Sequence, residues 1–378
     1  MHVAVVAGET SGDQLGSGVL ASLRGLVGDL RITGVGGSAM AAQGLESLHA
    51  MEDISLMGLD GVTEKVCKAI RIRNALFKTF LDDPPDVFLG IDIPDFNISL
   101  EQKLKAHRIP TAHLVSPTVW AWRSYRIRKI RKAVDRMLVL FPFEETFYRS
   151  HGVSAKFVGH PAADEIDQIT RKQAREKLAG EGLQVDRTTI ALLPGSRRSE
   201  IDKLGRLFLD TAERITQANS QIQFILPVAS TAVVEQLREL VYEHKGGSNV
   251  CLTEQNARLA IAAADVGLIA SGTAALEAAL LVRPIVVAYK VSRLSYLLAR
   301  LFATVRHVSM PNHLTEEPMV KEFLQGNANV DNLNGEIQRL LTDCLYRRQI
   351  EQAFQGLAGM LRNNANDEIA KELVYMTD

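Results

Sequence analysis

The sequence lacks the features that mark a metalloprotein, a disulfide-bonded secreted protein or a membrane-spanning chain. Its three cysteines, Cys67, Cys251 and Cys344, lie far apart, and we expect free thiols in a reducing cytosol. It has no Asp-x-Asp motif and no group of His and Cys residues with ligand spacing, so no metal site is predicted. No uninterrupted run approaches the ~18 apolar residues of a membrane span.

A strong charge of either sign is also missing. The net charge of the 378 residues is −1, so no global field favours nucleic acid as a partner. The first residues read as a β-strand and have neither the basic start nor the length of a signal peptide. Apolar residues make up 46% of the chain, enough for the cores of about two domains. We therefore expect a cytoplasmic protein that is at most peripheral at a membrane.

Short apolar runs alternate with longer helical patterns along the chain, which is typical of parallel sheets covered by helices on both faces. Strands are predicted near residues 2–7, 31–35, 86–91, 110–115, 136–141, 155–158, 188–193, 222–227, 249–252, 265–270 and 284–289. Helices are predicted at 201–218, 231–244, 256–263, 273–281 and within 335–376. The fold class is therefore α/β, with two doubly wound, Rossmann-like domains in series.

The polar stretch from Ala162 to Arg187 has no strand pattern and marks the crossing between the two domains. We place a first domain at 1–165, a second at 166–340, and C-terminal helices at 341–378 that pack on another domain or subunit. Two such domains leave a cleft between the carboxyl ends of their sheets, where doubly wound folds bind ligands. The candidate site residues fall at these strand ends.

A glycine-rich turn, Gly8 to Asp13, follows the first strand. It resembles a dinucleotide loop but does not match G-x-G-x-x-G, and residues 34–37 fail the same test. No acidic residue ends the second strand. A nicotinamide enzyme is therefore poorly supported, and no cofactor is predicted.

Asp92 follows the strand at 86–91, at the point where the chain emerges into the predicted cleft. A carboxylate there suits a general base, which must face the substrate hydroxyl whose proton it accepts. The alternative for Asp92 is a helix cap. Asp95 follows Pro94 and fits a turn residue or a cap equally well.

The segment Ser271-Gly-Thr-Ala-Ala-Leu-Glu277 follows an apolar strand and opens a helix. Gly272 lets the backbone approach a ligand, Thr273 can cap the helix, and the helix N-terminus favours an anion such as a diphosphate. Glu277, one turn later, can accept the two hydroxyls of a ribose. The simpler interpretation is an ordinary capped helix after a strand.

The strand near 188–193 ends in a loop that contains Gly195, Ser196, Arg197 and Arg198. Backbone N–H groups and a guanidinium form a phosphate site, because Arg offers a bidentate fork to phosphate oxygens. One arginine of the pair is expected to be a solvated loop residue. Asn312, in the polar loop at 309–313, can hydrogen-bond a sugar or a phosphate.

Two stretches, Leu59–Leu81 and Ser116–Lys132, combine apolar residues with charges that are nearly all basic. Such a face suits docking onto anionic lipid. The alternative is an ordinary amphipathic helix that packs on its sheet, which we expect for most of these apolar residues.

Eight segments together are similar to the lipid-A-disaccharide synthases, and they follow the order of that family from Ala7 to Asn312. They are Ala7-Gly-Glu-Thr-Ser-Gly-Asp13, Met57-Gly58, Gly90-Ile-Asp-Ile-Pro-Asp-Phe-Asn97, Val115-Ser-Pro-Thr-Val-Trp-Ala-Trp-Arg123, Phe157-Val-Gly-His-Pro161, Leu193-Pro-Gly-Ser-Arg197, Ser271-Gly-Thr-Ala-Ala-Leu-Glu277 and Pro311-Asn312. The chain departs from the family pattern at Thr10, where alanine is usual, and at His313, where an apolar residue is usual. The second departure leaves the role of its loop open.

The resemblance implies a GT-B glycosyltransferase, with two Rossmann-like domains facing across a cleft. Such an enzyme moves 2,3-diacylglucosamine from UDP to 2,3-diacylglucosamine 1-phosphate, forms a β(1→6) disaccharide 1-phosphate and releases UDP. It implies an inverting, metal-independent reaction at the inner membrane of Gram-negative bacteria, and a homodimer with exchanged C-terminal segments.

The resemblance and the residue patterns together assign the candidate site. Inversion needs one base on the acceptor hydroxyl and positive potential on the leaving diphosphate. The predicted catalytic residues are Asp92 and Arg197. The predicted substrate-binding residues are Glu9, Ser11, Asp13 and Asn312, and the predicted nucleotide-binding residues are Gly195, Ser196, Gly272, Thr273, Ala274 and Glu277.

Two other functions share part of this pattern. Another GT-B enzyme, such as a UDP-N-acetylglucosamine 2-epimerase or a transferase to a different lipid, would share 271–277 but need not carry 86–97 or the Trp-rich segment. A non-catalytic nucleotide- or lipid-binding protein would use Asp92 only as a cap.

Overall fold

The computed structural model describes residues 1–55, 62–166, 169–228, 233–244, 249–254, 257–292, 296, 305 and 307–377. The Met57-Gly58 motif and the first residues of the Leu59–Leu81 stretch lie outside this part of the chain. The chain divides into two compact units, one formed by Met1–Asp164 with Leu361–Asp378 and the other by Glu165–Met360.

The first unit is built on a parallel sheet of seven strands in the order β3-β2-β1-β4-β5-β6-β7. The strands are β1 (His2–Ala7), β2 (Arg31–Val35), β3 (Leu45–Ser47), β4 (Val87–Ile91), β5 (Thr111–Leu114), β6 (Arg136–Val139) and β7 (Ala155–Phe157). The central strands are buried on both faces, which explains why their sequences are apolar runs without alternation.

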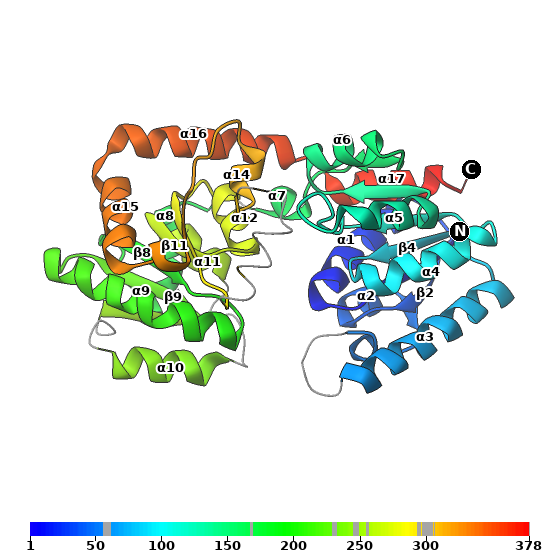
Figure 1. Ribbon diagram of the computed structural model, residues 1–378, viewed down its shortest axis with the longest axis horizontal. Coiled ribbons are helices and arrows are strands. Elements are labelled where there is room, and N and C mark those ends of the chain that lie inside the picture. Colours follow the sequence, from blue (N-terminus) through cyan, green and yellow to red (C-terminus); the bar gives the residue numbers. More distant parts are fainter. Residues whose placement is uncertain are drawn as a thin grey trace. The chain divides into compact units, whose positions relative to one another are not determined.

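Helices cover both faces of this sheet (Figure 1). They are α1 (Thr10–Leu26), α2 (Ser38–Ala42), α3 (Val62–Asp82), α4 (Pro94–Ala106), α5 (Ile127–Ala133), α6 (Pro142–Ser150) and α17 (Ala365–Tyr375), and the short helix α7 (Pro161–Glu165) spans the boundary between the two units. Alternate residues of β1 point to opposite faces: Val3 and Val5 pack with α1, α2 and α17, whereas Ala4 and Val6 pack with α3 and α4.

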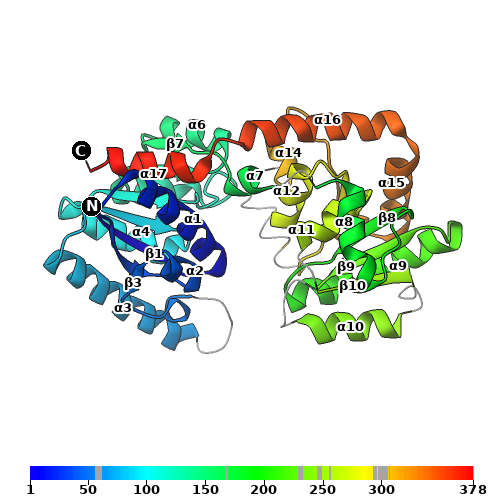
Figure 2. The same ribbon diagram turned by 180° about the vertical axis from the view of Figure 1, so that it is seen from behind.

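The C-terminal helix α17 belongs to the first unit and lies beside α1 (Figure 2). Ile369, Ala370 and Leu373 of α17 are fully buried in the core that includes β1 and β4. The Asp164 carboxylate accepts N–H groups from residues 363, 364 and 365 and thereby fixes the start of this helix.

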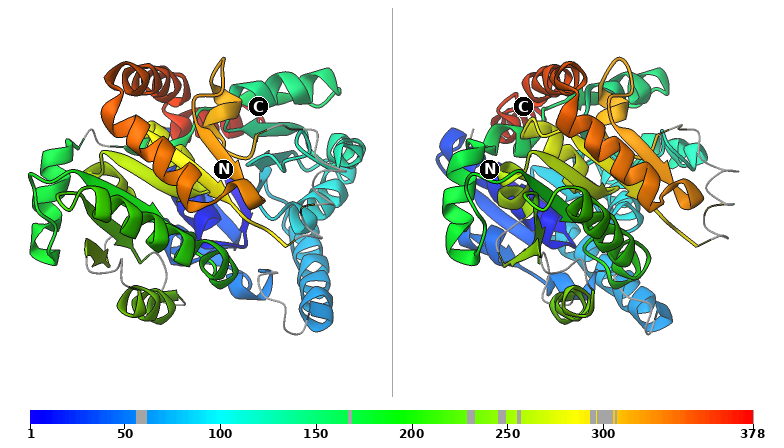
Figure 3. Two further views of the ribbon diagram at one scale, coloured as in Figure 1. Left: turned by 60° about the vertical axis from the view of Figure 1, so that its left-hand side comes forward. Right: turned by 90° about the vertical axis from the view of Figure 1, so that its left-hand side faces the viewer.

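The second unit repeats the design with six parallel strands in the order β10-β9-β8-β11-β12-β13. The strands are β8 (Thr189–Leu193), β9 (Gln223–Pro227), β10 (Val250–Thr253), β11 (Val266–Ala270), β12 (Ile285–Tyr289) and β13 (Lys321–Leu324). The helices are α8 (Arg171–Leu178), α9 (Arg198–Ala218), α10 (Val234–Glu243), α11 (Ala257–Ala263), α12 (Thr273–Leu280), α14 (Pro311–Leu314), α15 (Val330–Thr342) and α16 (Cys344–Leu361). Helix α9 packs against both α10 and α15, and Figure 3 shows α15 beside it.

The expected α/β class, the eleven strands named from the sequence and the helical C-terminal stretch are all present. Strands β3 and β13 were not predicted. β3 has three residues, and β13 is a partly exposed edge strand with charged residues, Lys321 and Glu322, so neither has an apolar run. The strand-free stretch from Ala162 to Arg187 holds helix α8. Among the described residues, no helix has the length and apolar character needed to cross a membrane.

Candidate functional site

Each sheet has one point where the strand order reverses, and the predicted site residues follow the strands at these points. In the first unit the reversal lies between β1 and β4, where Ala7 pairs with Ile91. In the second unit it lies between β8 and β11, where Leu193 pairs with Ile269. Loops that leave two strands in opposite directions at such a point open a crevice, which is where doubly wound folds bind ligands.

The reversal point of the second unit holds a pocket of about 510 Å³. All six predicted nucleotide-binding residues and Arg197 line it: Gly195, Ser196, Arg197, Gly272, Thr273, Ala274 and Glu277. Glu200, Pro227 and Tyr289 also contribute to the wall. Arg198 is the first residue of α9 and lies outside this lining, so Arg197 is the arginine of the pair that faces the pocket.

The loop after β8 is held by Glu200, which the sequence interpretation missed. Its Oε2 accepts the N–H groups of Ser196 at 3.1 Å and Arg197 at 3.4 Å. This is the reach of a carboxylate three residues into a helix, a recognisable capping pattern. Gly195 has φ +126°, and a Cβ there would lie 2.3 Å from Glu200 Oε2, so this turn requires glycine.

Helix α12 begins differently from the prediction for Thr273. The N-cap residue is Gly272, with φ +147° and no side-chain cap, and Thr273 is the first helical residue. The residues that carry the first N–H groups of the helix line the pocket, as an anion site at a helix N-terminus requires. Glu277 Oε1 lies 3.4 Å from Arg258 of α11, a second residue that the sequence interpretation missed.

In the first unit, Asp92 leaves β4 in a left-handed turn. Asp92 has φ +50° and Ile93 has φ +38°, conformations that cost of order 1–3 kcal/mol each for residues other than glycine. The N-cap of α4 is Ile93, and no side chain caps that end, so the alternative of Asp92 as a helix cap is wrong. Asp92 is half-buried, and no described residue donates a hydrogen bond to its carboxylate.

The glycine-rich turn after β1 packs against the Asp92 turn. A Cβ on Gly8 would lie 2.7 Å from Ile93 Cδ1, so glycine allows the close approach of the two turns. Glu9 is the half-buried N-cap residue of α1, and Ser11 is exposed in its first turn. Asp13 is buried, and its carboxylate accepts the N–H groups of residues 37, 39 and 40 at 2.8 to 3.0 Å. These contacts give Asp13 a structural role at the start of α2, and its predicted contact with substrate has no support from this geometry.

Asn312 also has a structural role. It is buried, and its amide donates to Val320 O and Glu322 Oε1 and accepts Val320 N–H, all within 2.9 Å. Both amide hydrogens are therefore used, and no free donor is left for the predicted contact with a sugar or phosphate. His313 Nε2 lies 3.0 Å from His307 O, and burial lowers the pKa of His313.

Glu144, in the first turn of α6, is a buried acid that the sequence interpretation missed. Trp120 Nε1 and Phe141 N–H donate to its two oxygens at 3.1 and 3.3 Å. Burial raises the pKa of Glu144 to about 7, although hydrogen bonds from Ser116, Trp120 and the backbone oppose the shift. Trp120, in the Ser116–Trp122 segment, therefore donates a hydrogen bond to a carboxyl group whose pKa is about 7.

The apolar residues of the basic stretches are divided between core and surface: Phe80 and Ile130 are buried, whereas Val66 is 37% exposed. On α3, Ala69 and Leu76 are buried, whereas Ile70 is 40% exposed. In the second stretch, Trp122 and Tyr125 are 44% and 72% exposed. Arg123 stacks over the Trp122 ring at 4.0 Å, and the basic residues around it are exposed at Arg128, Lys129, Arg131 and Lys132.

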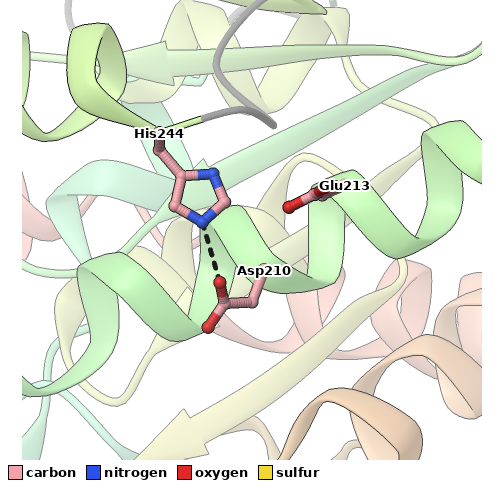
Figure 4. Close-up of side chains that lie close together, drawn as sticks. All are labelled: Asp210, Glu213 and His244. Carbon is pink, nitrogen blue, oxygen red and sulfur yellow. Dashed lines mark hydrogen bonds and ion pairs between the residues drawn. The ribbon is translucent and has the colours of Figure 1, made fainter.

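One group of possible metal ligands occurs in the described part of the chain: Asp210, Glu213 and His244 (Figure 4). His244 Nε2 lies 2.7 Å from Asp210 Oδ1, which is an ordinary ion-pair geometry for a histidine and an aspartate. Asp210 lies ten residues beyond Glu200 on α9, or about 15 Å along the helix at 1.5 Å per residue. None of these three residues lines the pocket.

Solved structures of similar fold define the class of this protein. UDP-GlcNAc 2-epimerase from Neisseria meningitidis, bound to UDP-GlcNAc, has a TM-score of 0.64 at 14% identity and covers 99% of both chains. The glycotransferase of kitacinnamycin has a TM-score of 0.63 at 16% identity, with 99% of this chain and 98% of that chain covered. At these identities the likeness concerns the fold alone. The two doubly wound units are those of a GT-B protein.

Sequence relatives narrow the class to one family. The lipid-A-disaccharide synthetase family model matches residues 3–373. The lipid-A-disaccharide synthase of Alkalilimnicola ehrlichii is 44% identical over 372 residues, covering 98% of this chain and 97% of its own. That of Pseudomonas aeruginosa is 42% identical over 379 residues, covering 100% and 98%. The chain belongs to the lipid-A-disaccharide synthase family and is a glycosyltransferase that forms the lipid A disaccharide.

Proposed function

We propose that this enzyme transfers 2,3-diacylglucosamine from UDP to 2,3-diacylglucosamine 1-phosphate by a single inverting displacement. The observation that carries the proposal is the pocket at the second reversal point, which Arg197, the first residues of α12 and Glu277 line together. A guanidinium and a helix N-terminus suit a diphosphate, and a carboxylate one turn further along suits the two ribose hydroxyls.

Asp92 acts as the general base in this proposal. It takes the proton of the acceptor 6-hydroxyl while that oxygen bonds to the anomeric carbon of the donor sugar. The bond between the anomeric carbon and the diphosphate breaks, and UDP leaves with the bonding electron pair. Arg197 and the N-terminus of α12 stabilise the charge that develops on the diphosphate. Inversion follows because the attack occurs once, from the face opposite to the leaving group.

The reaction in this proposal is independent of metal ions, because protein groups neutralise the leaving diphosphate. Activity should then survive EDTA. Complete loss with EDTA that Mg²⁺ restores would refute this part of the proposal.

The acyl chains of both substrates require access to a membrane, and the surface around Trp122 and Tyr125 has suitable chemistry. Exposed aromatic rings favour the membrane–water interface, and the neighbouring Arg128, Arg131 and Lys132 carry positive charge toward anionic lipid. We propose peripheral binding of this surface to the inner membrane.

A homodimer with exchanged C-terminal segments would form the α1–α17 contact between two chains instead of within one. Domain exchange reuses contacts that already exist, so the buried residues Ile369 and Leu373 would keep the same surroundings. Sedimentation equilibrium of the full-length protein tests this proposal, and a single monomeric species across the accessible concentration range would refute it.

An assay of UDP release tests the catalytic proposal. The enzyme should release UDP from UDP-2,3-diacylglucosamine only when 2,3-diacylglucosamine 1-phosphate is present, in a 1:1 ratio to disaccharide. UDP release that does not depend on the acceptor would refute the single displacement. Release with a different lipid acceptor but not this one would overturn the proposed acceptor.

A further inference from the structure

The turn that contains Asp92 and Ile93 has a strained backbone, and contacts with the surrounding structure must stabilise it. Ile93 has a left-handed backbone, with φ +38° and ψ +58°, which is an outlier for a β-branched residue. Such conformations persist only where the surrounding structure determines them. The contacts of the turn therefore decide where the Asp92 carboxylate points.

Asn97, in the first turns of α4, makes the side-chain contacts that hold the turn. It is fully buried. Its Nδ2 donates toward the carbonyl oxygens of Val6 at 3.2 Å, Ile91 at 3.3 Å and Asp92 at 2.9 Å. Because all three partners are acceptors, only this orientation of the amide is consistent with its surroundings. One side chain thus ties the ends of β1 and β4 to the backbone of Asp92.

A buried acid and a buried histidine lie beside Asn97. Glu101, one turn later on α4, and His113 on β5 are both fully buried, with Oε1 and Nδ1 2.7 Å apart. Burial raises the pKa of Glu101, while His113 opposes the shift. A Cβ on Gly90 would lie 2.1 Å from Glu101 Oε1 and 3.0 Å from Asn97 Cβ. The glycine in β4 therefore lets both side chains lie directly against the strand that carries Asp92.

The network formed by Asn97, Glu101 and His113 lowers the stability of the folded protein. In the described part of the chain, Asn97 Oδ1, Glu101 Oε2 and His113 Nε2 are buried without a hydrogen-bond partner. Apolar residues of similar volume often stabilise a protein as well as a buried pair or better. Stability alone does not explain why polar groups occupy this position.

We propose that Asn97 is a positioning residue for the catalytic carboxylate of Asp92, and that Glu101 and His113 hold the start of α4 against β4 and β5 for that purpose. The inference rests on the proposed role of Asp92 as the general base. The network supplies no proton and touches no substrate. It fixes the left-handed turn, so that the carboxylate is in place before the acceptor hydroxyl arrives.

Asn97→Asp tests the proposal, because it keeps the shape of the side chain but removes the donor to all three carbonyl oxygens. We expect kcat to fall about 10- to 100-fold, the loss expected from a small misplacement of a reacting group. The KM for the UDP-sugar and the calorimetric affinity for UDP should not change, since a defect confined to the transition state lowers kcat alone.

Thr111→Val is the matched control. Thr111 is buried on the same strand as His113, at the end away from the turn, and its hydroxyl donates to Ala133 O. This variant loses a buried hydrogen bond and should melt at a lower temperature with an unchanged kcat. If Asn97→Asp retains the kcat of Thr111→Val, the positioning role is refuted.

A double variant covers the case in which Asn97→Asp does not fold. Glu101→Met with His113→Leu replaces the buried pair by apolar side chains. We expect an equal or higher melting temperature together with a lower kcat, a combination that a purely structural role would not give. An unchanged kcat would overturn the role of the pair and, with it, the proposal that the network positions the Asp92 carboxylate.

Asp92→Asn separates this inference from the proposed function. If Asp92→Asn loses turnover while Asn97→Asp and the double variant keep it, only the positioning role fails. If Asp92→Asn keeps its turnover, the base has been misassigned and both proposals fail.

Discussion

At the reversal point of the second unit, two glycines with positive φ and a helix N-terminus line an open pocket. At the reversal point of the first unit, the residues with positive φ are Asp92 and Ile93. The buried polar side chains of Asn97, Glu101 and His113 lie beside this turn. The sheets have the same order around both points. The two points differ in the residues that follow the strand ends.

A glycine turn and backbone N–H groups suit a large anion that must bind and leave, because they let the backbone approach it closely. A strained turn of larger side chains suits a single group that must keep one orientation. This difference agrees with our proposal that the second unit binds the nucleotide and that Asp92 of the first unit is the base.

The largest effect is expected from Asp92→Asn. Loss of a general base typically lowers the rate by about 10²–10⁴. UDP affinity should stay unchanged, since the nucleotide is proposed to bind the other unit. Stopped-flow or steady-state UDP release and calorimetry measure the two quantities. Near-full turnover would move the role of the base to Asp95 or Glu9, because the Asp13 carboxylate is buried and already accepts three backbone N–H groups.

The second prediction concerns a buried acid of the first unit. The pKa of Glu144 in the folded protein, about 7, lies above its ordinary value of 4.5, so folding favours the protonated form. The resulting stability is fully present below pH 4.5 and is lost as the pH rises through 7. A difference of about 2.5 between the two pKa values corresponds to about 3 kcal/mol.

Glu144→Gln should therefore flatten the pH dependence of the free energy of unfolding between pH 4.5 and 7, measured by urea titration. Glu145→Gln is the control. Glu145 is on the same helix, and its carboxylate pairs with Arg149 on the protein surface. If both variants follow the wild-type curve, Glu144 does not titrate in this range.

The fold was predictable because the central strands of both sheets are parallel and buried on both faces. Their apolar runs, such as Val266–Ala270, stand out from the polar segments around them. The edge strands β3 and β13 lack this signal, because β3 has only three residues and β13 contains the charged residues Lys321 and Glu322.

The lining of the pocket was predictable where it consists of residues next to a strand end, as at Gly195 and Gly272. It was not predictable where a polar side chain reaches a distant segment. Asp13 and Asn312 were predicted to bind substrate, but their hydrogen bonds go to backbone and side-chain groups brought near by the fold. The role of Asn97 could not be predicted for the same reason, because its side chain donates to the carbonyl oxygen of Val6, which is 91 residues away in the sequence.

The third prediction tests the nucleotide side of the comparison. Glu277→Ala should weaken UDP binding by ~1.5–3 kcal/mol, the usual value of hydrogen bonds to a charged acceptor. Isothermal titration calorimetry measures this directly. Glu213→Ala, on α9 and away from the pocket, should bind UDP like the wild type. Equal affinities for the wild type and Glu277→Ala would refute the ribose assignment.

The smallest change in free energy per residue is expected for binding of the basic protein surface to lipid vesicles. The protein should co-sediment with phosphatidylglycerol vesicles and much less with phosphatidylcholine vesicles. Each basic residue near an anionic surface contributes ~1 kcal/mol, and salt screens this attraction within a Debye length. Arg128→Gln with Arg131→Gln should therefore reduce binding, whereas Lys172→Gln with Lys177→Gln, on α8 of the second unit, should not.

Aromatic insertion is a separate contribution that salt does not remove. Trp122→Ser with Tyr125→Ser should leave the fold intact, because both side chains are exposed, and should make the vesicle-bound protein easier to release with salt. Ile70→Ser tests α3 in the same way. Leu76 is unsuitable for this test, because it is fully buried and its replacement would open the core instead. Equal binding to neutral and anionic vesicles, insensitive to salt and to all of these changes, would mean that the basic stretches form a plain solvated surface.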